Sequence, residues 1–475
     1  MSGPTFQFVG FALLVALLMS VNRSTLWRQT VMLLASAVFL ATFQVGWLGF
    51  APLAGFLLLG YVALRQSSTQ ATWVFPTALI SILLFFFWIK KYVFVPSAVW
   101  LTFPYVTVGV SYMLFRLLHL IIEAKDDPAL GKTPFRTYLT YMVGFNTLVA
   151  GPIQLFEDYR SEEDAALTRR IGWLYTGEAA ERIVIGLFKT NVLAAILAQL
   201  RDTSLTRMTN GTGNYLDAAL TFGLYPFFLY CNFSGYIDIV VGVTLMMGHR
   251  LPENFIRPFT ATSVIDFWNR WHITLSRWLR TYVYNPFLMS MLRRFPSRRL
   301  ESTWAVCAFF LTFFLIGVWH GQTIAFLFFG VLSGFAVSVN KVCQLVLTAR
   351  YGRKKYERIS SNFVYESVGR GLNITWWAFT LTWFWASWES ARALWSRQSV
   401  GEWLVIWIAL LLVITIVLAA WVATRDAIEK ITWRNVALLS SRRLHMVWFT
   451  ALLFIVVAAT LLSNQSAPQI VYKDF

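Results

Sequence analysis

Long apolar runs separated by short polar segments recur from one end of the 475-residue chain to the other. A helix that crosses a bilayer needs about 20 consecutive, mostly apolar residues. Runs of about this kind lie near residues 5–21, 28–43, 45–64, 75–93, 97–122, 136–156, 180–200, 214–232, 235–249, 303–319, 322–346, 371–391, 401–424 and 445–463. Two of them, 136–156 and 235–249, are short or contain Gly, Pro, Asn or Asp, so we expect re-entrant or broken helices there.

This pattern predicts an all-α, polytopic membrane protein with roughly 11–13 transmembrane helices plus re-entrant or interfacial helices. Composition agrees, because 57% of the residues are hydrophobic and 13% are charged, against about 25% charged in an ordinary soluble domain. No soluble domain is expected beside the membrane part. We therefore interpret residues 1–475 as a single membrane domain.

The formal net charge of +17 could suggest a nucleic-acid partner. However, Lys and Arg lie mostly in short loops between apolar runs, where positive charge orients spans and contacts anionic headgroups. The expected partner is the lipid bilayer, and no nucleic acid is expected. Basic residues in 350–358 predict a cytoplasmic loop. The run 322–346 would then cross the membrane from the outside to the cytoplasm, and the run 303–319 would cross it from the cytoplasm to the outside. The break between the two runs should therefore lie in the outer half of the protein.

Residues 250–302 are too polar to cross the bilayer in direct contact with lipid, yet they are rich in aromatic residues. Spacing predicts one helix over 264–285, in which Asp266 and Arg270 can pair. Its apolar stripe comprises Val264, Phe267, Trp268, Trp271, Leu275, Trp278 and Tyr282, and its polar face comprises Asn269, His272, Ser276 and Arg280. Two interpretations remain open: an interfacial anchor, or a helix packed inside a bundle against a polar tunnel.

His320 stands between two strongly apolar runs and is flanked by Gly317 and Gly321. Glycines allow another backbone or a substrate to approach closely. An ionisable group at membrane depth indicates a functional site, and loss of hydration favours a neutral imidazole that can accept a proton. The alternative is a structural histidine bonded to a backbone carbonyl group.

The five histidines show no metal-ligand spacing, so no metal site is expected. His249 adjoins basic loop residues and is interpreted as solvated or headgroup-facing. His119 lies in an apolar run and is interpreted as a packing residue.

Several motifs resemble those of one family. They are Asp266–Arg280 (DFWNRWHITLSRWLR), Gly317–Gly321 (GVWHG), Asn232–Asp238 (NFSGYID), Arg250–Asn254 (RLPEN) and Val149–Pro152 (VAGP). In their order along the chain they resemble the membrane-bound O-acyltransferase (MBOAT) family, in the bacterial branch that includes alginate O-acetylation and D-alanyl transfer proteins. The resemblance covers residues 109–334, which would form the catalytic core. Asn269, where an arginine is common in the branch, and Met289–Ser290, where two glycines often follow Pro286, depart from the pattern.

The resemblance implies helices around a thin centre, with a central tunnel that meets the histidines. It implies His320 as the catalytic base and His272 as its catalytic partner. The substrate or tunnel residues that we expect are Asn269, Ser276, Trp268, Trp271, Trp278, Trp319, Arg270, Arg280, Asp238 and Asn232. No permanently bound cofactor is expected, and the co-substrate would be an acyl thioester, either acetyl-CoA or an acyl carrier protein.

The favoured interpretation is acetyl transfer to an exported polysaccharide, or to a periplasmic acyltransferase partner that completes the transfer. D-alanyl transfer from a carrier protein to a cell-envelope polymer is the alternative within the family. From other classes, a transporter or flippase has broken helices and buried polar groups as well, and a non-catalytic membrane scaffold would not need its histidines. The expected location is the bacterial cytoplasmic (inner) membrane, crossed many times.

Overall fold

The computed structural model describes residues 5–43, 46–67, 73–169, 172–430, 432–433, 436–437 and 442–462, together with 468 and 471. The described chain is mostly helical, which confirms the all-α class. It divides into two compact units. Unit 1 is Met1–Leu187, Gly235–Pro252 and Gln469–Phe475, and unit 2 is Phe188–Ser234 and Glu253–Pro468.

Unit 1 contains the N-terminal helices. These are α1 (Phe6–Val21), α2 (Thr25–Ala41), η1 (Trp47–Phe50), α3 (Ala51–Ser67), α4 (Val74–Ile89), η2 (Ser97–Val99), α5 (Val110–Glu123), η3 (Leu130–Lys132), α6 (Phe135–Val143), α7 (Phe145–Leu148), α8 (Phe156–Thr168) and α9 (Trp173–Phe188), whose last residue begins unit 2. The second half of α12 (Tyr225–Met246) also belongs to unit 1.

Packing in unit 1 depends on close backbone approach as well as on apolar side chains. Helix α3 packs against α4 and α5, and α2 packs against α1 and α6. A Cβ on Gly186 of α9 would lie 2.5 Å from the Gly235 carbonyl oxygen of α12. Glycine at position 186 is therefore required for these two helices to meet at this distance.

Unit 2 contains the π-helical turn η4 (Lys189–Leu193) and the following elements. They are α10 (Ala194–Thr209), α11 (Tyr215–Gly223), the first half of α12, η5 (Pro258–Thr260), α13 (Val264–Trp268), α14 (Ile273–Leu279), the π-helical turn η6 (Arg280–Tyr284), α15 (Asn285–Arg294), α16 (Arg298–His320), α17 (Ile324–Tyr351), α18 (Arg353–Ser360), α19 (Phe363–Trp385), α20 (Trp388–Trp395), α21 (Val400–Glu429), β1 (Thr432–Trp433), β2 (Val436–Ala437) and α22 (Arg442–Leu462). The two short strands are antiparallel, with Thr432 opposite Ala437.

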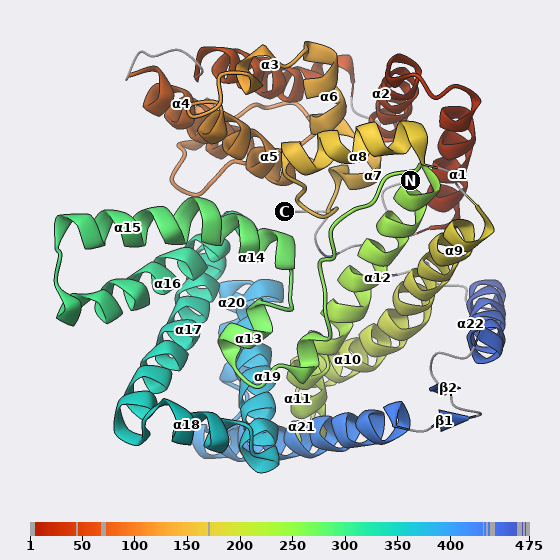
Figure 1. Ribbon diagram of the computed structural model, residues 1–475. Helices are drawn as coiled ribbons and strands as arrows, with labels where there is room; N and C mark the ends of the chain where they lie inside the picture. The colour runs from red at the N-terminus through yellow and green to blue at the C-terminus, as the bar shows by residue number, and fades with distance from the viewer. Residues whose placement is uncertain are drawn as a thin grey trace. The chain divides into compact units, whose positions relative to one another are not determined.

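The helical hairpin α16–α17 is the most extensive pairing in unit 2. Figure 1 shows α18 joining the adjacent ends of α17 and α19. A Cβ on Gly317 would lie 2.5 Å from the Phe326 carbonyl oxygen and would also meet the backbone of Gly330. The close approach expected from Gly317 is therefore confirmed, and it holds α16 against α17 directly before His320.

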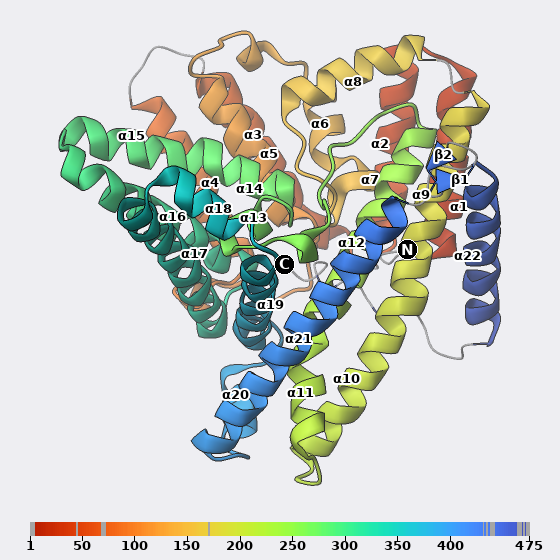
Figure 2. The same ribbon diagram turned by 60° about the horizontal axis from the view of Figure 1, so that its bottom comes forward.

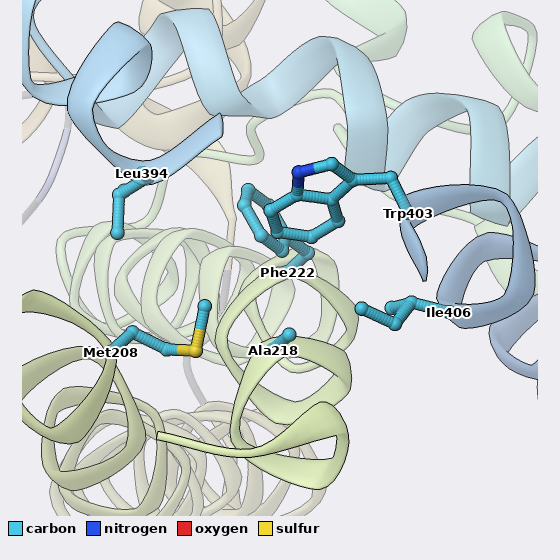
Figure 3. Packing of buried hydrophobic residues seen from close by; sticks show 6 residues of the cluster. All are labelled: Met208, Ala218, Phe222, Leu394, Trp403 and Ile406. Carbon is cyan, nitrogen blue, oxygen red and sulfur yellow. The ribbon is translucent and has the colours of Figure 1, made fainter. Parts of the chain in front are cut away.

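The long helix α21 packs along α19 and contacts α11, with α20 near its N-terminal end (Figure 2). A buried cluster fixes this arrangement and comprises Met208, Ala218, Phe222, Leu394, Trp403 and Ile406. Figure 3 shows the Trp403 indole beside the Phe222 ring, and the two ring centroids are 5.5 Å apart at 82°. Because the cluster joins α10, α11, α20 and α21, it supports the part of unit 2 that is remote in sequence from the histidines.

Six helical segments of the described chain are long and apolar enough to cross a membrane. They are Trp47–Ser67, Tyr175–Thr209, Tyr215–Met246, Arg299–His320, Ile324–Tyr351 and Val400–Glu429. Phe6–Val21, Thr25–Ala41, Val74–Ile89 and Met446–Leu461 are shorter apolar helices. These findings confirm a polytopic membrane protein, whereas the count of roughly 11–13 spans stays a prediction.

Three sequence expectations about local structure were wrong. Residues 97–109 are largely non-helical, so the expected span 97–122 is only the helix α5. The expected separation between 214–232 and 235–249 is absent, because α12 runs unbroken through Asn232 and Gly235. The single helix expected over 264–285 is interrupted at 269–272 and ends in a π-helical turn.

Candidate active site

His272 lies at the point where the polar, aromatic segment of unit 2 breaks. It is the N-cap residue of α14 and has left-handed backbone angles, φ 45° and ψ 53°. A non-glycine residue in this region is uncommon and is typical of functional sites held by their surroundings. The side chain is 1% exposed, and its ring lies edge-on to Phe233, with centroids 5.1 Å apart.

Asn254, the last residue of the Arg250–Asn254 motif, holds the backbone that follows His272. Its carbonyl oxygen accepts a hydrogen bond from the Ile273 N–H at 3.0 Å. Its side-chain Oδ1 accepts from the Thr274 N–H at 3.1 Å and from the Thr274 hydroxyl at 2.8 Å. Since Asn254 is fully buried, these bonds fix the start of α14 and therefore the position of His272.

His320 is the last residue of α16 and is 3% exposed. Its ring is enclosed by aromatic side chains: Trp319, Phe329 and Phe384 have ring centroids 4.6, 5.8 and 5.1 Å away. Phe329 belongs to α17 and Phe384 to α19. The ring is therefore held inside protein, at the junction of three helices.

Trp319 connects the two histidines. Its indole ring is tilted against His320 and lies edge-on to His272 at a centroid distance of 6.4 Å. The indole is 6% exposed. One aromatic side chain thus contacts both imidazoles, which brings the two sequence motifs into one buried site.

A cavity of about 260 Å³ lies beside this site. Four of the expected substrate or tunnel residues line it: Trp268, Asn269, Ser276 and Arg280. On α16 the cavity is lined by Phe309, Thr312, Phe313 and Ile316. Arg280 is exposed and donates a hydrogen bond to the Asn269 Oδ1.

Two residues that line the cavity lie one helical turn from a histidine. Ile316 lines it, and His320 follows Ile316 by one helical turn on the same face of α16. Ser276 also lines it, and the Ser276 N–H bonds to the His272 carbonyl oxygen at 3.0 Å, one turn earlier. The two helices that line the cavity therefore also carry the two histidines.

The remaining expected residues of this segment have packing and pairing contacts. Trp271 is 1% exposed and lies against Phe267 and Trp377, at centroid distances of 5.6 and 4.5 Å. Trp278 is buried beside Tyr282. The expected pair of Asp266 and Arg270 is confirmed at 2.9 Å. These contacts place Trp271 in an aromatic core, and its tunnel role stays a prediction.

Asn232 and Asp238 lie on the same helix but in different units. Asn232 is fully buried in unit 2, next to Phe233, whose ring contacts His272. Asp238 belongs to unit 1, where it pairs with Arg182 at 2.6 Å. The structure therefore buries Asn232 one residue before Phe233 and gives Asp238 an ionic partner on α9. The substrate role of Asn232 stays a prediction.

Burial dominates the electrostatics of the site. It lowers the pKa of the His272 imidazole to about 3, although a hydrogen bond with its own backbone acts in the opposite direction. His272 is therefore neutral near pH 7. Among the residues that the structure describes, no group of three or more His, Cys, Asp or Glu could hold a metal ion.

Sequence reasoning missed two contributions to the site. Asn254 was part of a recognised motif, but its partner Thr274 lies 20 positions further along the chain, so the motif gave no indication that Asn254 anchors α14. Thr312 and Ile316 looked like ordinary residues of an apolar span. Their spacing of eight and four residues before His320 was the available signal, because it places them on the same helix face.

The chain is also similar to known proteins in sequence. Residues 64–369 match the membrane-bound O-acyltransferase family. The chain is 32% identical to the teichoic acid D-alanyltransferase of Bacillus subtilis over 287 residues, which cover 58% of this chain and 69% of that protein. It is 30% identical to the probable alginate O-acetylase AlgI of Pseudomonas fluorescens, over 53% of this chain and 48% of that protein. It is 32% identical to the peptidoglycan O-acetyltransferase of Helicobacter pylori, over 44% of this chain and 37% of that protein, so the last two are matched over half of their length or less.

Proposed function

Because this chain belongs to the membrane-bound O-acyltransferase family, we propose that it moves an acyl group, and most readily an acetyl group, from a cytoplasmic thioester to a hydroxyl on the outer side of the membrane. The family makes the chain a multi-pass membrane acyltransferase. The observation that carries the proposal is the pair of buried imidazoles, His272 and His320, which both lie against the Trp319 indole. The helix α14, whose N-cap residue is His272, and the helix α16, which ends at His320, also line the cavity of about 260 Å³.

In the proposed reaction His320 acts as the general base. Its neutral imidazole takes the proton from the acceptor hydroxyl as the hydroxyl oxygen attacks the thioester carbonyl carbon. The new C–O bond forms, the C–S bond breaks, and the proton passes from the imidazolium to the departing thiolate. General-base assistance of this kind is worth roughly two to four orders of magnitude in rate.

His272 serves as the catalytic partner, which orients the thioester and donates a hydrogen bond to the oxyanion that forms on the carbonyl. Asn269 and Ser276 line the donor cavity with Trp268, while Arg280 at its exposed end would contact donor phosphates. The indoles of Trp319 and Trp278 exclude water, which would otherwise hydrolyse the thioester.

The donor in this proposal is acetyl-CoA or an acyl carrier protein, used as a co-substrate. The acceptor is an exported polysaccharide, or a periplasmic acyltransferase partner that completes the transfer. This arrangement suits the bacterial cytoplasmic membrane, because the positive-inside argument puts the His320 end of α16 toward the outside and its basic start toward the cytoplasm. The cavity along α16 would then face the donor side.

D-alanyl transfer to a cell-envelope polymer is the second candidate. The observation in its favour is the similarity to a teichoic acid D-alanyltransferase, which extends over 58% of this chain. Mass spectrometry of surface polymers from cells with and without the gene separates the two, since an acetyl ester adds no nitrogen whereas a D-alanyl ester adds an amine.

The proposal is tested by complementing a strain that lacks the gene with the wild-type chain, with His320→Ala, or with Thr323→Ala. Thr323 is an exposed neighbour whose side chain does not cap α17, so its variant is a matched control. We expect surface acylation to fall by roughly two orders of magnitude or more in His320→Ala alone. Near-normal acylation by correctly inserted His320→Ala protein would remove His320 from the mechanism and favour a scaffold or a transporter.

A further inference from the structure

A second polar cavity lies within unit 1, apart from the residues assigned to acyl transfer. It has a volume of about 40 Å³, and its lining includes Arg28 of α2, Arg116 of α5, Glu163 of α8 and His249. One water needs roughly 10–15 Å³ of cavity volume, so the cavity can hold about three waters or one small oxyanion. His249, expected to be solvated or headgroup-facing, is half-buried, and its Nε2 is shielded from solvent.

The two arginines that line this cavity are deeply buried. Arg28 is 6% exposed and Arg116 is 2% exposed. Both donate to backbone carbonyl groups: Arg28 to Met247 at 2.5 Å, and Arg116 to Tyr141 at 2.9 Å, among others. Carbonyl oxygens satisfy N–H donors, but they do not neutralise a guanidinium charge.

Neither guanidinium has a carboxylate counter-ion within 4.0 Å among the residues that the structure describes. Buried arginines are rarely found without a paired charge, because removing a charge from water is costly. Two such charges on one cavity therefore call for a negative group between them.

Hydrogen-bonding capacity is also left over at the cavity. Within the described part of the chain, the Nε of Arg28, the Nε of Arg116 and the Nε2 of His249 are buried and have no hydrogen-bond partner. Buried polar nitrogens of this kind normally have one, either in the protein or in a bound molecule. Guanidinium groups match the oxygens of carboxylate and phosphate groups particularly well.

Glu163 acts on Arg28 electrostatically, but it is a single carboxyl group beside two arginines. Its Oε1 accepts a hydrogen bond from the Gln29 side chain at 2.8 Å, and burial raises the pKa of this carboxyl group. A carboxyl that takes up a proton more readily offsets less of the arginine charge. The lining thus remains positive overall.

We propose that the cavity formed by Arg28, Arg116 and His249 binds one small oxyanion, a carboxylate or a phosphate group. The group comes either as a free ion or as the phosphate of an anionic lipid headgroup. The site lies within unit 1 and is distinct from the residues of the proposed acyl transfer. The anion-binding proposal is therefore independent of that reaction.

The test for a free ion uses the purified full-length chain in neutral detergent. The midpoint of thermal unfolding is followed as sodium phosphate or sodium acetate replaces sodium chloride at constant ionic strength. We expect a saturable rise of roughly 2–4 °C for one of them. Arg28→Gln and Arg116→Gln should abolish the rise, whereas Arg23→Gln, at an exposed position five residues before Arg28, should keep it.

The test for a lipid source uses nanodiscs of phosphatidylcholine with or without phosphatidylglycerol. If the lipid supplies the group, phosphatidylglycerol raises the midpoint of the wild type and of Arg23→Gln but not of the two cavity variants, and free ions have little further effect. No rise with either source, or the same rise in the cavity variants as in the wild type, overturns the proposal.

A variant that is expected to strengthen anion binding keeps the proposal testable if either arginine variant fails to fold. Glu163→Gln has nearly the same shape and removes the one carboxyl group among the described residues that line the cavity. We expect it to bind the anion several-fold more tightly, measured as a lower concentration at half-maximal rise. Unchanged or weaker binding contradicts a site in which Arg28 and Arg116 hold a negative group.

Discussion

The side chain of Asn254 accepts two hydrogen bonds from a single residue, Thr274, through the backbone N–H at 3.1 Å and the hydroxyl at 2.8 Å. The two residues are 20 positions apart in the sequence and both are buried. This contact fixes the first turn of α14, and His272 is the residue that begins that turn.

Replacement of Asn254 by Ala is expected to lower acyl transfer by roughly 10- to 100-fold while leaving most of the protein inserted and folded. It removes the acceptor of two hydrogen bonds from Thr274, and the loss of a buried hydrogen-bond partner costs about 1–3 kcal/mol. Thr274→Val removes only the hydroxyl donor and should have a much smaller effect. Transfer rates are measured in membranes at matched protein levels, and equal rates for Asn254→Ala and the wild type would exclude this positioning role.

A bulky residue at position 312 should narrow the cavity beside the histidines. Thr312 is buried and lines that cavity of about 260 Å³. Thr312→Phe is expected to slow acetyl transfer by roughly tenfold and butyryl transfer by considerably more, because added volume in a packed site forces displacement. Thr312→Val keeps the shape and is the control. Competition between the two acyl donors gives the ratio, and an unchanged ratio would place the acyl group elsewhere.

The contact between α16 and α17 predicts an asymmetry between two glycines. A Cβ on Gly317 would meet the Phe326 carbonyl oxygen and the Gly330 backbone, whereas a Cβ on Gly177 of α9 meets nothing within 4 Å. We expect Gly317→Ala to destabilise the protein by about 1–3 kcal/mol. Gly177→Ala should be stabilising by about 0.5–1 kcal/mol, from helix propensity. Unfolding in detergent measures both, and similar effects from the two variants would contradict the packing argument.

Glu162 predicts a dependence of stability on pH. Burial alone would raise the pKa of its carboxyl group, but hydrogen bonds from the Arg169 side chain and from the Arg250 N–H outweigh it and lower the pKa below 4.5. Because the pKa is lower in the folded state, the ionised carboxylate stabilises the fold at pH values above the pKa that the group has in the unfolded state. This contribution is lost as the pH falls through the folded-state pKa.

Glu162→Gln should therefore lower the unfolding midpoint at pH 7 by roughly 1–2 °C, a modest effect because the pair is about one fifth exposed. The difference from the wild type should shrink as the pH falls below 4.5. Glu157→Gln, at an exposed position on the same helix, serves as the control. If the difference in unfolding midpoint between Glu162→Gln and the wild type grew as the pH fell, the lowered pKa of Glu162 would be contradicted.

Some parts of the site follow from sequence pattern and others do not. The apolar runs on either side of His320 correctly predicted two helices with a break between them, because hydrophobic length is decided locally. The interruption at His272 could not be predicted in this way. The apolar stripe over 264–285 has helical spacing, but the buried bonds of Asn254 impose a left-handed residue in its middle. Long-range hydrogen bonds overrode the local periodicity.

The unbroken helix α12 illustrates the opposite error. The sequence predicted separate runs over 214–232 and 235–249, with a re-entrant or broken helix in the second. Protein covers 94% of the apolar stretch within Tyr215–Met246, so the polar groups there are not exposed to lipid. Gly235 faces α9 at Gly186, where a small residue permits close packing. Without knowledge of neighbouring helices, a packing glycine and a helix-breaking glycine look alike.

The left-handed backbone at His272 restricts which substitutions its position can accept. Only glycine, and to a lesser degree asparagine and aspartate, adopts these angles readily. Most replacements there would disturb the chain path as well as remove the imidazole, so a saturation library would mix misfolding with loss of chemistry. In His272→Gly and His272→Asn, a loss of activity can therefore be attributed to the loss of the imidazole. For the same reason, few single substitutions in evolution could replace this histidine by another proton-transfer residue without disturbing the backbone.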